Sequence, residues 1–385
     1  MDRPQTAIIT PAALAEIVYF TARFAQINST NMVSTLEIKK ELVAQSKLPE
    51  VDFDNIVFGR VYSDHMFVAD YADGDWKNFR INPYEFLRLS PANATLHYGQ
   101  SIFEGLKAYR SPEGEILVFR PMDNYRRLNH SGRRMCIPEL PEDVFMQGLT
   151  ELLRTDKGWV PEADGTSLYI RPFIFAADEY IGIRPSDTYR FMIFTCPVGA
   201  YYSGSVKVKI ETQYSRAFPG GTGSAKAAGN YAGSLYPAKL AQQQGYHQLV
   251  WTDGLEHKYI EESGTMNVMF IIDDTLITAP AGDTILNGIT RDSVLTLARD
   301  WGMKVEERPV EVAEVVDAAR AGKITEAFGT GTAATIAQID TIGIGDEQFA
   351  LPAVEGREFS NKVLKTLNDI RYGRIEDPHN WVYKI

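Results

Sequence analysis

The order of strands and helices along the chain is the feature that most limits its fold. Residues 56–62 and 66–71 are short apolar runs ended by Asp73-Gly74-Asp75, which predicts strands. Residues 104–110 and 115–120 flank a Ser-Pro-Glu-Gly turn, which predicts a hairpin. Further strands are predicted at 167–175, 189–196, 206–212, 247–252, 266–272 and 275–279, and helices at 122–135, 142–154, 231–244, 290–301 and 356–371. This mixed order favours an α+β fold over a doubly wound parallel sheet.

The length of the chain predicts more than one domain. A chain of 385 residues exceeds what one hydrophobic core usually organises. Residues 197–205 are rich in Pro, Gly and Ser, as is typical of a linker. We therefore expect an N-terminal extension at 1–50, a small α+β domain at 51–196 and a large α+β domain at 206–385.

The N-terminus contains an apolar stretch at residues 7–28. Glu16 and Arg23 interrupt it, so it is too broken to cross a bilayer and makes a poor signal peptide. We expect a short surface helix or an unstructured extension. Met32 is an alternative start of translation, a hypothesis that the intact mass of the native protein would test.

The charge balance argues against nucleic-acid and membrane partners. The formal net charge is −11, and phosphate-rich surfaces repel such a protein. The two cysteines, Cys136 and Cys196, lie far apart and have no metal-ligand spacing, which indicates reduced thiols and no zinc site. We therefore expect a cytoplasmic protein without a metal, without nucleic acid and without a membrane.

A lysine surrounded by glycine and alanine stands out in residues 219–231, PGGTGSAKAAGNY. Small residues let the backbone approach a ligand and leave space beside the Lys226 amine. A phosphate-binding P-loop is excluded because that motif needs Gly-Lys-Ser or Gly-Lys-Thr, whereas Lys226 has alanine on both sides. A surface loop with a solvated lysine remains the alternative for this segment alone.

Two further segments combine polar and small residues. Residues 257–268, HKYIEESGTMNV, lead acidic side chains into an apolar strand, and residues 328–333, FGTGTA, form a turn whose amides suit an anion. Each segment by itself is more typical of a tight turn or a helix cap than of a functional site.

Taken together, residues 55–340 resemble the branched-chain aminotransferases, which are class IV pyridoxal-phosphate enzymes of fold type IV, and in particular their eukaryote-like subgroup. The matching segments follow the family order. They are FGRVYSDHMF (58–67), LHYGQSIFEGLKAYR (96–110), FRPMDNYRRL (119–128), LYIRP (168–172), AKAAGNY (225–231), EESGTMN (261–267), LNGITRDS (286–293) and FGTGTAA (328–334). The resemblance implies a two-domain α+β protein with pyridoxal 5′-phosphate between the domains.

The resemblance assigns the catalytic role to Lys226, the lysine that holds the cofactor covalently. Glu262 matches the carboxylate that faces the pyridine nitrogen, where it would keep that nitrogen protonated. Glu261 is the competing neighbour, and the Glu-x-Gly-Thr spacing to Gly264 and Thr265 favours Glu262. Glu261 is then expected to be an exposed strand residue.

The other cofactor contacts implied by the resemblance are Arg127, Tyr231, Ile289, Thr290 and Thr332. Arg127 matches the phosphate-binding arginine, and its neighbour Arg126 should face solvent because adjacent helix positions diverge by about 100°. Ile289 and Thr290 open a predicted helix, whose free amides favour an anion.

Aromatic residues dominate the implied substrate site, which comprises Phe58, Tyr98, Phe103, Tyr169, Arg171, Thr332 and Ala333. Strand periodicity places Tyr169 and Arg171 on one face of a sheet. Aromatic walls suit leucine, isoleucine and valine, and Arg171 would serve the more polar glutamate. Some of these aromatics could equally be core residues.

The resemblance further implies a homodimer whose pocket borrows residues from the partner, and a ping-pong transfer of the amino group to 2-oxoglutarate. One departure concerns the Cys-x-x-Cys pair of mammalian members, whose positions correspond here to Ala334 and Ala337. A thiol switch at that place is therefore not available. The alternatives are a D-amino acid transaminase, an amine transaminase, an aminodeoxychorismate lyase and a non-catalytic cofactor-binding protein.

Overall fold

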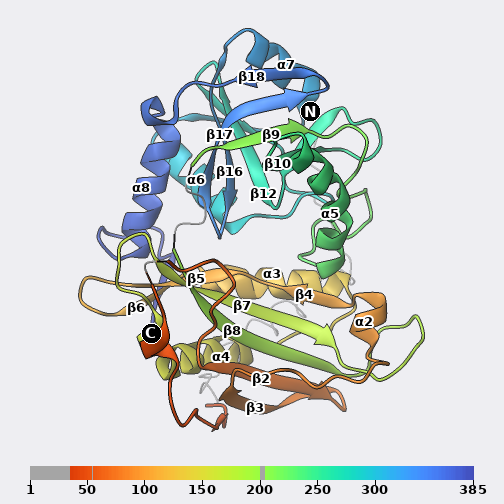
Figure 1. Cartoon of the computed structure of the whole chain (residues 1–385), viewed down its shortest axis with the longest axis vertical. Helices are drawn as coiled ribbons and strands as arrows, with labels where there is room; N and C mark the ends of the chain where they lie inside the picture. Colours follow the sequence, from red (N-terminus) through yellow and green to blue (C-terminus); the bar gives the residue numbers. More distant parts are fainter. Residues whose placement is uncertain (1–34, 54, 200–203) are drawn as a thin grey trace, which may run out of the picture. The chain divides into compact units, whose positions relative to one another are not determined.

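Two β-sheets organise the chain in the computed structural model (Figure 1). The first sheet has nine strands, in the order β1-β3-β2-β8-β7-β5-β6-β19, with β4 paired to β7. Their bounds are β1 Lys39–Lys40, β2 His65–Ala72, β3 Asp75–Pro83, β4 Ser101–Phe103, β5 Leu106–Arg110, β6 Ile116–Phe119, β7 Ser167–Ala176, β8 Tyr189–Val198 and β19 Val382–Lys384. The last strand, β19, pairs antiparallel with β6, so the C-terminus completes a sheet built from the N-terminal half.

Helices α3 (Pro121–Arg134) and α4 (Glu142–Thr155) pack with the first sheet. The α4 sequence places its apolar side chains on one stripe, and Phe145, Leu149 and Leu152 are fully buried there. They pack with Phe67 of β2 and Phe191 of β8 in the core of this half of the chain. The short helix α2 (Ala94–Tyr98) precedes β4.

The second sheet has ten strands, in the order β14-β13-β12-β16-β17-β9-β10-β11-β15, with β18 paired to β17. Their bounds are β9 Val206–Ile210, β10 Gln248–Thr252, β11 Tyr259–Ser263, β12 Met266–Ile272, β13 Thr275–Thr278, β14 Lys304–Glu307, β15 Val310–Glu311, β16 Ile324–Gly331, β17 Thr335–Ile344 and β18 Glu347–Ala350. An additional pairing of β11 with β12 closes part of this sheet into a ring.

Four helices accompany the second sheet: α5 (Ala228–Gln243), α6 (Ile289–Asp300), α7 (Val312–Arg320) and α8 (Phe359–Arg371). Side chains of α6 and α8 share a core cluster with β12, β16 and the first-sheet residues Tyr109 and Phe119. The α7 residue Val315 packs with the strands of the ring in a separate cluster. The shared cluster joins the two sheets near the pocket described below.

The structure describes residues 35–53, 55–199 and 204–385. The predictions for residues 7–28 and for Met32, and the middle of the predicted linker at 197–205, lie outside these ranges. Leu36–Ile385 forms one compact unit by its internal contacts. Within the described residues, no helix has both the length and the apolarity that a membrane crossing requires.

The predicted elements are confirmed for most of the chain, and one strand is wrong. Residues 56–62 form no strand. Residues 58–60 form a turn, in which Gly59 adopts a positive φ of 70° and the Arg60 amide donates to the Val57 carbonyl. Strand β3 was not predicted because polar side chains interrupt its apolar positions. Strands β11, β16 and β17, the short strands β14 and β15, and the helix α7 also escaped prediction.

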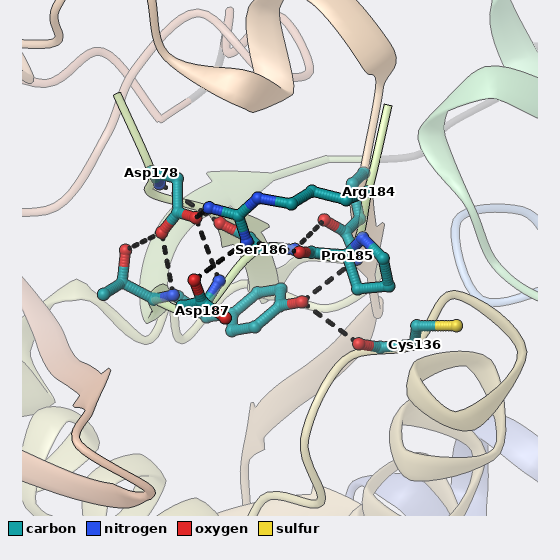
Figure 2. Close-up of polar contacts among 9 residues, drawn as sticks. Cys136, Asp178, Arg184, Pro185, Ser186 and Asp187 are labelled. Carbon is teal, nitrogen blue, oxygen red and sulfur yellow. Dashed lines mark hydrogen bonds and ion pairs between the residues drawn. The ribbon is translucent and has the colours of Figure 1, made fainter. Parts of the chain in front are cut away.

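The loop between β7 and β8 is fixed at its base by the Asp178 carboxylate (Figure 2). This carboxylate accepts hydrogen bonds from the Thr188 hydroxyl at 2.6 Å, the Arg184 guanidinium at 3.0 Å and the Asp187 amide at 3.0 Å. Burial opposes ionisation, but the hydrogen bonds from Thr188 and its neighbours lower the pKa of Asp178 to about 2. The tip at 180–183 exposes tyrosine and isoleucine side chains.

Candidate active site

A pocket of about 580 Å³ is lined by residues of both sheets. The first sheet contributes β4, β7 and β8, and the second half of the chain contributes the start of α5, strand β12, the start of α6 and the β16–β17 turn. Of the predicted site residues, eleven line the pocket: Phe58, Phe103, Arg127, Tyr169, Arg171, Lys226, Tyr231, Ile289, Thr290, Thr332 and Ala333. The pocket therefore brings together segments that are far apart in the sequence.

Lys226 lies just before α5, and its backbone is held in place from both sides. Its amide donates to the Ser131 hydroxyl at 2.9 Å, and its carbonyl accepts from the Phe103 amide at 3.0 Å. The Lys226 Nζ atom donates to the Tyr231 hydroxyl at 3.1 Å and lies 4.9 Å from the centre of the Phe103 ring. A primary amine with a fixed backbone thus faces the pocket beside a phenol.

Glu262 of β11 is a buried carboxylate next to the pocket. Its Oε1 accepts from the Leu286 amide at 2.7 Å, and its Oε2 lies 3.0 Å from the Arg216 guanidinium. Burial raises the pKa of Glu262, and the positive charge of Arg216 opposes that rise. Glu262 lines a small cavity that shares Tyr231, Thr265 and Leu286 with the pocket. Arg216 was not predicted as a site residue, because a charge partner that is distant in sequence is defined only by the fold.

The expectation that Glu261 is exposed is wrong. Only 6% of the residue is exposed, and its Oε2 has no hydrogen-bond partner in the described part of the chain. Burial raises the pKa of Glu261. Adjacent side chains of β11 point to opposite faces, but both faces are covered here because β11 is part of the ring.

Arg127 of α3 is a second charged residue of the site. Its charge is opposite to that of Glu262, and its hydrogen-bond partners are different. Its Nε and Nη2 donate to the two carboxylate oxygens of Glu104, each at 2.7 Å, and its Nη1 donates to the Asn287 carbonyl at 3.0 Å. Glu104 is fully buried. The sequence analysis missed Glu104, although it lies next to Phe103. Arg126 is exposed, as predicted.

An anion cradle is formed by Arg127, the first residues of α6 and the β16–β17 turn. Helix α6 begins at Ile289 after Gly288, and no side chain caps its first amides. Ile289, Thr290 and Thr332 all line the pocket. Free amides at a helix start and a guanidinium favour a phosphate or carboxylate group.

Aromatic side chains and Arg171 form the remaining wall. The Arg171 Nη2 donates to the Tyr169 hydroxyl at 3.1 Å, so both side chains lie on one face of β7 as predicted. The Arg171 guanidinium lies 4.6 Å from the Phe103 ring centre, and the rings of Phe58 and Tyr169 pack edge to face at 5.2 Å. An apolar ligand side chain would be buried here beside the Arg171 guanidinium.

Tyr98 differs from the predicted substrate site, and the two positions of the cysteine pair were expected to lack thiols. Tyr98, at the end of α2, is 39% exposed and does not line this pocket. Ala334 lines the pocket and Ala337 is buried in β17, so neither provides a thiol.

The residues present fit pyridoxal 5′-phosphate. Lys226 supplies an amine for the aldehyde, Glu262 a buried carboxylate for the pyridine nitrogen, and the cradle a set of donors for the phosphate. The buried Thr330 hydroxyl lines the pocket and has no hydrogen-bond partner within residues 35–53, 55–199 and 204–385, so a polar ligand atom would satisfy it.

Comparison with known proteins gives the class of protein that this fold and site define. Residues 101–342 match the family model of the amino-transferase class IV proteins, and the chain belongs to that family. Its cofactor is pyridoxal 5′-phosphate, on which the class depends.

Within that class the chain is one of the branched-chain-amino-acid aminotransferases. It is 44% identical to branched-chain-amino-acid aminotransferase 2 of Bacillus subtilis (strain 168), over 90% of this chain and 97% of the relative. It is also 44% identical to the branched-chain-amino-acid aminotransferase of Mycolicibacterium smegmatis, over 85% and 92%. Among solved structures, a branched-chain aminotransferase from Thermoproteus uzoniensis with norvaline is 25% identical, with a TM-score of 0.67 over 83% of this chain and 99% of that one.

Proposed function

We propose that this chain transfers the amino group of L-leucine, L-isoleucine or L-valine to 2-oxoglutarate in two half-reactions that share one pocket. The observation that carries the proposal is the meeting of Lys226, the buried Glu262 and the Arg127 cradle around an aromatic-walled pocket. When bound, the cofactor supplies an aldehyde that accepts the amino group and a ring that withdraws electrons from the reacting carbon.

Lys226 would carry the proton between the substrate Cα and the cofactor. Its backbone is held by Ser131 and Phe103, and its Nζ is oriented by the Tyr231 hydroxyl. The amine is therefore held in one position from which it would reach both the substrate Cα and the cofactor. A positioned amine of this kind serves as a general base when it is unprotonated and as a general acid after it has taken the proton.

Glu262 and Arg127 would hold the cofactor at opposite ends. The Leu286 amide and Arg216 hold the two oxygens of Glu262, and Glu104 holds one edge of the Arg127 guanidinium through two hydrogen bonds. Each cofactor contact is therefore backed by a buried partner, which keeps it in position before the cofactor binds.

The side-chain wall explains how one pocket would accept two kinds of substrate. Phe58, Phe103 and Tyr169 can bury a branched aliphatic side chain, which contributes roughly 1.5–3 kcal/mol. Arg171 lies among them and could pair with the second carboxylate of glutamate or 2-oxoglutarate.

A half-reaction scan tests the substrate class. The purified protein is mixed with one amino acid at a time, and the cofactor absorbance is followed, with Lys226→Ala as the inactive control. We expect rapid conversion with leucine, isoleucine, valine and glutamate. Conversion by D-amino acids or simple amines instead would assign the chain to another activity of this fold, and binding without conversion would make it a non-catalytic protein.

We also propose a homodimer in which a second copy covers apolar side chains that are exposed here. These are Leu96 and Tyr98 of α2, Tyr180, Ile181 and Ile183 of the β7–β8 loop, and Leu235 and Tyr236 of α5. Tyr98 would then act in the pocket of the partner copy. Mass measurement by light scattering should give twice 43.1 kDa; a monomer at working concentrations would refute the dimer.

The two-domain division at 51–196 and 206–385 remains a proposal, as does a cytoplasmic location. The separate sheets support the division, with the reservation that β19 belongs to the first sheet. Limited proteolysis should cut first within 197–205.

Fractionation of native cells should recover the protein with cytoplasmic markers, and recovery with membranes or medium would contradict that location.

A further inference from the structure

Two cationic side chains are buried behind the anion cradle: Lys107 of β5 and Arg371 of α8. Lys107 is 8% exposed and Arg371 is 2% exposed. Both line a cavity of about 10 Å³, and Ile289, Thr290 and Thr332 line this cavity as well as the main pocket. The cradle residues are therefore the wall between the pocket and the two cations.

Neither cation forms an ion pair with a carboxylate in the part of the chain that the structure describes. The Lys107 Nζ donates to the Ala333 carbonyl at 2.8 Å. The Arg371 Nη1 donates to the Thr335 hydroxyl at 2.5 Å, and its guanidinium lies 4.5 Å from the Phe119 ring centre. Its buried Nε has no hydrogen-bond partner among the described residues. All these interactions are with neutral groups.

Such an arrangement is costly for the protein alone. A buried charge without a counter-charge loses its hydration, and two like charges near each other repel. Burial, followed by the charge of Arg371, lowers the pKa of Lys107 to about 7. The groups that face Lys107 are Arg371 of α8 and the Cys196 thiol of β8, while Tyr109 of β5 faces Arg371. A dianion in the cradle would supply the missing counter-charge.

We propose that Lys107 and Arg371 make the cradle selective for a phosphate dianion, acting through the wall formed by Ile289, Thr290 and Thr332. This inference rests on the proposed cofactor site. Phosphate fits better than a carboxylate because its double charge gains about twice as much from each cation. Phosphate also suits the adjoining α6 N-terminus.

Calorimetric titration of the cofactor-free full-length chain with inorganic phosphate tests the proposal. Lys107→Met removes the charge and keeps a side chain of similar length, and we expect affinity to fall about tenfold or more. The matched control is Lys323→Met, which removes an exposed lysine paired with Asp273 and should leave affinity unchanged. Arg371→Met should act in the same direction as Lys107→Met and serves as the second variant if one fails to fold.

Proton uptake gives a readout that a merely structural role would not change. At pH 8 Lys107 is mostly neutral, and a bound dianion should raise its pKa, so the wild-type chain should take up a proton on binding. Titrations in two buffers of different ionisation enthalpy measure this uptake, which Lys107→Met should lose. Pyridoxal, which lacks the phosphate, should bind both forms alike, whereas pyridoxal 5′-phosphate should distinguish them.

The outcomes separate this inference from the proposed function. If Arg127→Met loses phosphate while Lys107→Met and Arg371→Met bind it like the control, the cofactor site stands and the inference is overturned. The inference would also be overturned if Lys107→Met and Arg371→Met weakened the binding of carboxylate ligands but not of phosphate. If the wild-type protein does not bind phosphate, or if Arg127→Met binds it as well as the wild type does, the anion cradle is not the phosphate site. The proposed cofactor site and this inference then both fail.

Discussion

Replacement of Glu104 by glutamine should destabilise the cofactor-free protein more than its single-atom change suggests. Glu104 is fully buried and receives two 2.7 Å hydrogen bonds from Arg127, whose side chain is 10% exposed. Burial alone would lower the pKa of Arg127, but the Glu104 charge raises it above its ordinary value, so the pair is ionised. Glutamine can accept one of these bonds and turns a second donor toward the guanidinium.

The expected loss is about 3–5 kcal/mol of unfolding free energy, the usual cost of leaving one buried charge without its partner. Loss of one charge-assisted hydrogen bond accounts for roughly 1.5–3 kcal/mol of it. Urea denaturation of cofactor-free protein measures the change, with the exposed Glu256→Gln as control. A difference from that control below about 0.5 kcal/mol would refute the view that Glu104 neutralises Arg127.

Three further predictions concern the cofactor carboxylate, the thiols and the β7–β8 loop. Glu262→Gln should cut the transamination rate roughly 100-fold, a loss of about 3 kcal/mol of transition-state stabilisation. Glu261→Gln should keep most of the activity. If Glu261→Gln is the inactive variant instead, the roles of the two carboxylates are exchanged. Mild peroxide should leave activity intact and dithiothreitol should not raise it, because Cys196 is buried and burial raises its pKa to about 11. Cys136 is exposed. If peroxide inactivates the enzyme and Cys136→Ser abolishes that inactivation, the Cys136 thiol is the sensitive group instead. Asp178→Asn should speed amide hydrogen exchange at 180–183 at neutral pH. Because hydrogen bonds lower the folded-state pKa of Asp178, its stabilisation should hold above about pH 4 and be lost only as pH falls toward 2; equal exchange in the variant would contradict this anchor.

Local patterns in the sequence predicted the parts of the fold that depend on neighbouring residues. The helix at 122–135, the hairpin at 104–120 and the β7 face shared by Tyr169 and Arg171 are confirmed. Such features follow from side-chain periodicity and turn residues, which act within a few positions. The resemblance to a family then named the residues that the pocket brings together.

The sequence did not predict the partners that support those residues. Glu104 is 23 positions from Arg127, and Arg216 is separated from Glu262 by helix α5 and strand β10. A charged residue in sequence is usually a surface residue, so nothing local distinguishes a buried counter-charge from a solvated one. The burial of Glu261 was misjudged for a related reason, since closure of the ring depends on strands far along the chain.

The pairing of β19 with β6 has a consequence for the order in which the protein can fold. Strand β6 is synthesised early, but among the described residues its outer edge is covered by Val382–Lys384, and the Ile385 amide donates to the Ile116 carbonyl at 3.0 Å. During translation the first sheet therefore carries an open edge until residues 382–384 have left the ribosome. An open edge strand can pair with other chains, so nascent protein should depend on chaperones at this edge. Truncation of only the last few residues would leave every active-site residue in place and still extend that exposure for the life of the molecule.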